Sequence, residues 1–74
     1  MEGTGVMIYP DGRRYEGGFF NDKKQGSGIM YSTDGSRTEG QWLKGRLHGE
    51  GKEIDKYGSE SYAKWHMGKL LYHL

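Results

Sequence analysis

The 74-residue sequence has no cysteine and only one proline. Without cysteine, the chain can form neither a disulfide framework nor a thiolate metal site. This composition fits a reducing compartment, so we expect a cytoplasmic protein. No apolar run approaches the length of a transmembrane helix. The opening residues, MEGTGVMIYPDG, also lack the basic and apolar regions of a signal peptide.

A strong charge of one sign is missing too. Eleven basic and ten acidic residues give a net charge of +1, and the two signs are interleaved along the chain. Nucleic-acid binders concentrate basic residues to neutralise phosphates, so we expect no nucleic-acid partner. A chain of this length forms one small domain, residues 1–74, with a modest core.

Glycine, by contrast, is abundant, and its spacing is periodic. All but one of the fourteen glycines follow a period of twenty-three residues. Residues 15–37, YEGGFFNDKKQGSGIMYSTDGSR, are followed without a gap by a second copy, TEGQWLKGRLHGEGKEIDKYGSE. Such a period indicates a repeat architecture. It divides the chain into a partial unit 1–14, full units 15–37 and 38–60, and a degenerate capping unit 61–74.

Within each unit, apolar and polar residues alternate as in a half-buried strand. In the first full unit, Tyr15 and Phe19 share one face of a strand. Residues 21–25 read as a polar turn. The return strand follows, with Ile29 and Tyr31 on its apolar face. Glycine weakens a strand unless a ring from a neighbouring strand lies over it, so we expect the rings to cover the glycines.

The segments Y-E-G-G-F and Q-W-L-K-G-R-L-H-G-E-G, with D-G turns on this period, resemble MORN repeats (membrane occupation and recognition nexus). The resemblance implies an all-β fold, a single twisted antiparallel meander of β-hairpins with a groove on one side. It also implies protein–protein interaction, scaffolding at membranes or the cytoskeleton, and phospholipid binding. The sequence departs from the family pattern where Thr38 and Ser61 replace a tyrosine and Asp22 replaces a turn glycine.

An aromatic stripe runs through the units and has two interpretations. It is the core of a one-layer sheet, together with Ile29 and Ile54, or it lines a groove that takes a helix or strand from a partner protein. Both can hold if the edge of the stripe contacts the partner. The groove residues predicted in this way are Tyr15, Phe19, Tyr31, Trp42 and Trp65.

The ninth position of each unit is basic, and these cations are expected to line one edge of the sheet. Such a row attracts anionic headgroups such as phosphoinositides. The alternative is a row of solvated turn residues that discourages aggregation of sheet edges. The lipid-binding residues predicted in this way are Lys23, Arg46 and Lys69, reinforced by Lys24 and Lys44.

Catalytic and metal-binding patterns are absent. The GTG, GSG and GEG triplets lack the following helix and lysine of a phosphate loop. His48, His66 and His73 have no metal-ligand spacing, and His48 is expected in a turn. Caging of choline by successive glycine-rich hairpins is a further interpretation, but the spacing fits it poorly. We therefore expect a non-catalytic protein with no metal and no cofactor.

The two ends of the array predict a further interaction. The first strand, residues 3–9, begins in mid-repeat, so the chain is either a naturally short protein or a piece of a longer array. An unpaired strand edge invites pairing with another strand. The last residues, 66–74, are expected to cap the array as a strand or a short helix and are the most apolar segment. Self-association through the ends of the sheet is thus an alternative to a partner in the groove.

Overall fold

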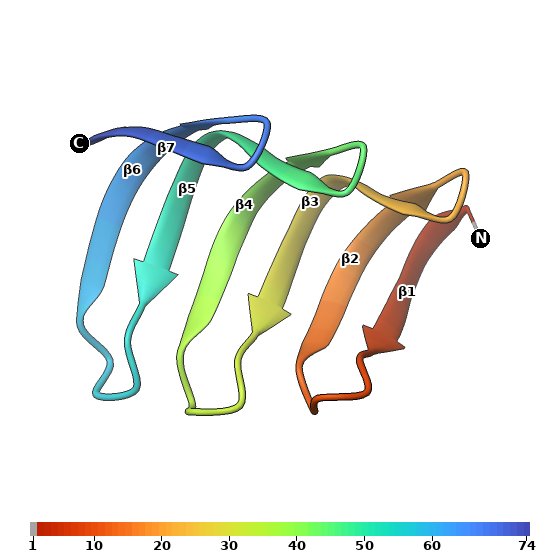
Figure 1. The fold of residues 1–74 in the computed structure, drawn as a ribbon, viewed down its shortest axis with the longest axis horizontal. Helices are drawn as coiled ribbons and strands as arrows, with labels where there is room; N and C mark the ends of the chain where they lie inside the picture. The colour runs from red at the N-terminus through yellow and green to blue at the C-terminus, as the bar shows by residue number, and fades with distance from the viewer. Residues whose placement is uncertain (1) are drawn as a thin grey trace.

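The computed structural model describes residues 2–74, which form one sheet of seven antiparallel strands in chain order (Figure 1). Met1, with which the predicted partial unit begins, lies outside the described residues. The predicted all-β meander is confirmed. No helix occurs in residues 2–74, and so none that could cross a membrane. The strands are β1 (Gly3–Ile8), β2 (Arg14–Phe20), β3 (Lys23–Tyr31), β4 (Arg37–Leu43), β5 (Arg46–Ile54), β6 (Glu60–His66) and β7 (Lys69–His73).

The turns that join β2 to β3, β4 to β5 and β6 to β7 lie along one edge of the sheet, the upper edge in Figure 1. Each contains two residues with positive φ, a geometry that matches the twist of the flanking strands. The predicted turn at residues 21–25 is therefore too long, because the strand already resumes at Lys23. The turn residues are Asn21 and Asp22, Lys44 and Gly45, and Met67 and Gly68.

The turns along the lower edge depend on aspartate side chains. In the second of them, Asp34 accepts a hydrogen bond from the Ser36 N–H at 2.9 Å. In the third, Tyr57 stands where this aspartate is expected. There Asp55, two residues earlier, accepts from the N–H groups of Tyr57 and Ser59 at 2.9 and 3.0 Å. The third turn thus keeps its shape because a neighbouring carboxylate satisfies the loop backbone.

A bulge bends each of the two complete hairpins close to its upper turn. Between the Gly17–Gly28 and Phe19–Lys24 pairs, β2 has one residue and β3 has three. Gly26 in this bulge has a φ of 77°, which favours glycine. The next hairpin repeats the bulge at Gly49, with a φ of 88°. The bends bring rings that lie near the upper turns over the middle of the sheet.

Most of the buried core lies on one face of the sheet, which we call the aromatic face. Tyr15, Phe19, Trp42 and Leu47 form its central cluster. The Tyr15 ring is fully buried and meets Phe19 and Trp42 edge-on, with centroids 5.2 and 5.4 Å away. The Trp42 indole N–H donates to the Gly28 carbonyl at 3.2 Å. Burial raises the pKa of Tyr15 above the ordinary tyrosine value.

Glycines cross the sheet directly beneath these rings. Gly17, Gly28, Gly40 and Gly51 are paired in one row across β2 to β5. A Cβ on Gly28 would overlap the Tyr15 ring, and one on Gly51 would lie 3.3 Å from the indole of Trp65, described further below. The expectation that rings cover glycines is therefore confirmed.

The other face of the sheet, which we call the open face, carries the apolar residues that were expected among the rings. Tyr15 pairs with Met30, so Ile29 and Tyr31 point to the open face. Ile54 lies there too, paired with Arg37. Ile54 is buried there, so its predicted burial is confirmed, but the predicted place of these three residues beside the rings is wrong. The reason is the turn length: a five-residue turn would pair Tyr15 with Tyr31, whereas the observed two-residue turn exchanges the two faces of β3.

The tail forms a strand and not a helix, since β7 pairs with β6 in antiparallel register. Every residue of β7 is exposed. The last residue still contacts its neighbour, because the Leu74 N–H donates to the Tyr62 carbonyl at 2.8 Å. Strand β7 therefore adds to the sheet but contributes no buried residue to the core.

Candidate functional site

The open face contains a hollow of about 400 Å³ that extends over β3 to β6 and the chain end. Its side chains come from successive strands because Ile29, Glu39, Lys52 and Tyr62 are paired in one row across the sheet. The floor is formed by glycine backbone, since the row Gly28–Gly40–Gly51 carries no side chains. On the aromatic face the same glycines make room for the rings, because a Cβ on them would point to that side.

The walls of the hollow combine apolar and charged groups. The apolar side chains are those of Ile29, Tyr62 and Leu74. Tyr62 is 50% exposed and Leu74 is 63% exposed. Lys52 forms an ion pair with Glu60 at 3.0 Å and lies 5.9 Å from the centre of the Tyr62 ring. The hydrogen bond to Glu60 raises the pKa of Lys52, so this wall stays positively charged. Such a mixture of exposed apolar and polar groups suits a protein segment.

The carboxylates of the hollow differ in their partners. Glu39 forms an ion pair with Arg37 at 3.1 Å on the side of the hollow towards the lower edge. Glu50 is exposed and paired by register with Lys64 of β6. The hollow therefore presents Gln41 and Glu50 on one side and Lys52 on the other. Both donors and acceptors are available to a partner backbone.

The five predicted groove residues are divided between the two faces. Tyr15, Phe19 and Trp42 are buried in the core of the aromatic face. Trp65 packs against the same cluster and is only partly buried. Tyr31 lies on the open face, where the guanidinium of Arg14 stands 4.5 Å from its ring centre. The structure thus brings four of the five together, three of them as core.

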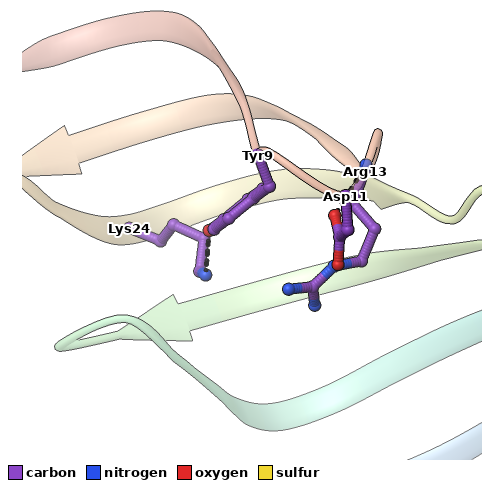
Figure 2. A network of polar contacts seen from close by, with 4 residues as sticks. All are labelled: Tyr9, Asp11, Arg13 and Lys24. Carbon is purple, nitrogen blue, oxygen red and sulfur yellow. Dashed lines mark hydrogen bonds and ion pairs between the residues drawn. The ribbon is translucent and has the colours of Figure 1, made fainter.

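Lys24 is also on the aromatic face, apart from the other predicted lipid-binding cations. Its ammonium donates to the Tyr9 hydroxyl at 2.7 Å, as Figure 2 shows. The rings of Tyr9, Tyr15 and Trp42 lie 5.2, 5.7 and 5.2 Å from it. Beside it, Arg13 stacks on Tyr9 at 4.8 Å and pairs with Asp11. Lys24 therefore stabilises the core through cation–π contacts.

The remaining four cations follow the predicted row. Lys23, Arg46 and Lys69 begin β3, β5 and β7, and Lys44 lies in the middle turn. All four are exposed along the upper edge (Figure 1). We call them the cationic edge.

Phe20 adds an apolar group to the cationic edge. It pairs with Lys23 across the first upper turn and is 54% exposed. The sequence carried a signal for it, because Phe20 is the one large apolar residue on the polar side of its strand. That residue was not assigned a role from the sequence.

The histidines do not assemble a metal site. His48 lies in β5 and not in a turn, and its ring centre is 5.0 Å from that of His66. Nowhere in residues 2–74 do three or more histidine or carboxylate groups gather to hold a metal ion. His48 instead accepts the Met67 N–H through Nδ1, at 3.2 Å.

The sequence profile of the MORN repeat matches residues 1–13, 15–37 and 39–56, more than half of the chain. The chain belongs to the MORN-repeat family. A search of curated proteins found no match. The resemblance read from the repeat is thereby confirmed. MORN repeats are generally non-catalytic modules for interaction with proteins or membranes.

The MORN profile does not reach the last hairpin. Strands β6 and β7 lie beyond residue 56, and they carry the replacements Ser61 and Ala63. Ala63 continues the glycine row of the earlier units, paired with Gly51, and is buried. Ala63 therefore shows that a methyl group fits at this position of the row.

Proposed function

We propose that this MORN-repeat chain binds a segment of a partner protein in the hollow of the open face. The observation that carries the proposal is the half-exposed Tyr62 beside a glycine-floored space of about 400 Å³. Tyrosine with an apolar ring and a polar tip is enriched among residues that dominate binding. The proposal differs from the predicted aromatic groove because the rings of that groove are mostly core. It places the chain in the cytoplasm, at membrane or cytoskeletal structures where a scaffold acts.

The test removes one wall of the hollow. Proteins retained from extract by the immobilised chain are identified, and the binding segment of each is mapped and titrated. Tyr62→Ala is expected to weaken a segment bound in the hollow at least about tenfold, the effect of losing roughly 1.4 kcal/mol. Tyr57→Ala is the matched control, because Tyr57 is 84% exposed in a turn that does not line the hollow.

The control should bind like the parent chain. Equal losses in both variants would point to a general tyrosine effect and contradict the hollow as the site. A segment that binds all three proteins equally would place the interaction elsewhere on the molecule.

A second candidate function is peripheral binding to anionic membranes through the cationic edge. The observation that favours it is the exposed Phe20 beside Lys23, since an apolar side chain flanked by cations suits the membrane interface. The cationic edge is formed at successive turns, so its side chains can contact a flat membrane at the same time. In this proposal Lys24 takes no part, because it is held among the core rings.

We expect Lys23→Gln combined with Arg46→Gln to weaken binding to phosphoinositide-containing vesicles about thirtyfold. Each cation near the membrane contributes about 1 kcal/mol, and about 1.4 kcal/mol corresponds to a factor of ten. Co-sedimentation at low salt gives the partition coefficient. The control is Arg13→Gln with Lys56→Gln, which removes two positive charges at the lower edge. If the parent does not bind at low salt, or if both double variants lose affinity equally, the cationic edge is not a membrane site.

A further inference from the structure

Each of the last two upper turns is fastened to the preceding hairpin by two hydrogen bonds. One is made by the backbone: Gly45 donates to the Lys24 carbonyl at 3.0 Å, and Gly68 to the Leu47 carbonyl at 2.7 Å. In the other hydrogen bond, a backbone N–H of the turn donates to a side-chain acceptor of the preceding hairpin. This second bond differs in chemistry between the two turns.

Gln25 supplies the side-chain acceptor for the middle turn, and His48 supplies it for the last. The Lys44 N–H donates to Oε1 of Gln25 at 3.3 Å, and the Met67 N–H donates to Nδ1 of His48 at 3.2 Å. His48 stands one period after Gln25. The chain therefore contains the same fastening twice, once with an amide and once with an imidazole.

We propose that His48 is a proton-sensitive fastening that releases the hairpin formed by β6 and β7 on acidification, while the Gln25 fastening holds. An imidazole that accepts at Nδ1 is neutral and carries its hydrogen on Nε2. A proton on Nδ1 turns the acceptor into a donor that faces the Met67 N–H. Imidazole is the side chain whose charge normally changes between about pH 5 and 8, whereas an amide does not titrate.

The titratable and charged groups around His48 come from β5, β6, β7 and the preceding turn. His66 of β6 lies 5.0 Å away, centre to centre, and pairs with Lys69 of β7. Arg46, on the same strand as His48, lies beside Gly68. Its side-chain atoms are 3.6–3.8 Å from the position that a Cβ on Gly68 would take. Lys44 lies in the preceding turn, and Glu50 is two residues along β5. The groups around His48 are therefore one further histidine, three cations and one carboxylate.

The outer strand of the last hairpin, β7, can also open at low cost. All residues of β7 are exposed, and the core cluster comes from β2, β4 and β5. Local opening of a region with few buried contacts requires less free energy than global unfolding. Losing one turn bond can therefore shift this hairpin without melting β1 to β5.

The test measures amide hydrogen exchange by NMR at about pH 7.5 and pH 5, corrected for intrinsic rates. In the parent chain we expect protection of the Met67 and Gly68 amides to fall at least about tenfold at the lower pH. The Lys44 and Gly45 amides of the middle turn should change less than about threefold. His48→Gln is expected to keep protection of the last turn at both pH values, because it restores the acceptor of the other unit. His66→Gln should retain the fall.

Two results would overturn the proposal. The first is equal loss of protection in the parent and in His48→Gln, or no loss in the parent. The second comes from the parent chain alone, in case the variant does not fold. Long-range proton–nitrogen correlation at about pH 7.5 should show His48 with its hydrogen on Nε2, and a hydrogen on Nδ1 would exclude the fastening.

Discussion

Gly28→Ala should destabilise the protein by at least about 3 kcal/mol, because a Cβ there would overlap the Tyr15 ring. Tyr15 is fully buried and contacts both other rings of the core cluster, so it has no free direction in which to move. Displacing this ring would remove the largest fully buried side chain from the core. For a chain of this size we expect the Tm, measured by circular dichroism, to fall by at least about 12 °C.

Gly51→Ala is the matched control for Gly28→Ala. Gly51 occupies the same position of the next unit, and neither glycine has a positive φ. A Cβ on Gly51 would lie 3.3 Å from the Trp65 indole, a distance that a small shift of the partly buried ring can relieve. We expect a cost of about 1 kcal/mol. Equal costs at the two positions would show that overlap with the Tyr15 ring is not decisive, since the backbone entropy of a Gly→Ala change favours folding.

Trp42→Ala should lower the free energy of unfolding by about 3–5 kcal/mol, as for other buried large aromatics. Trp42 is 9% exposed, meets Tyr15 edge-on and donates its indole N–H to Gly28. Lys24 would also lose one of its three rings. Because a domain of this size has a total stability of roughly 5–10 kcal/mol, the variant should lose about a third or more of it and unfold at a clearly lower denaturant concentration than the parent.

Trp65 provides the comparison, since it holds the same position in the next unit. Its indole N–H is buried but has no hydrogen-bond partner among residues 2–74. Trp65→Phe removes this unpaired donor, whereas Trp42→Phe breaks a bond. We therefore expect Trp65→Phe to be nearly neutral and Trp42→Phe to cost about 1–2 kcal/mol. The prediction that Trp42 is the central core ring is contradicted if both variants unfold at the same denaturant concentration.

The candidate site could be predicted only in part, because its position depends on the face to which each strand turns its side chains. The alternation of side chains within β3 could be predicted, but the sequence does not say which of the two alternating sets of side chains shares a face with Tyr15. That choice is made by the number of residues in the upper turn, and Asn21-Asp22 carries no glycine to mark a two-residue turn. The turn is shorter by three residues and the bulge adds two residues to β3, so Tyr15 pairs with Met30 and not with Tyr31. The hollow on the open face follows from the same register.

The role of Lys24 was hidden for a related reason. Its neighbours in sequence are polar, and Leu47 holds the same position in the next unit. Lys24 pairs with Phe19 next to the two-residue turn and so faces the rings, while Lys23 beside it remains at the exposed edge. Tyr9, from the neighbouring unit, completes the contacts. Contacts that cross units depend on the bend of the sheet, which no single unit encodes.

The sequence by itself determined the repeat, the family and the strand content of this protein. Glycines at fixed positions and rings at the fifth position are local chemical requirements, because a ring can lie on a strand only where no Cβ stands in its way. Tertiary structure alone decided which side chains share a face, which cations stay exposed and where the hollow lies. Those properties depend on turn length, bulges and the docking of one hairpin on the next. They involve atoms from neighbouring units, and a one-residue change in pairing exchanges the two faces.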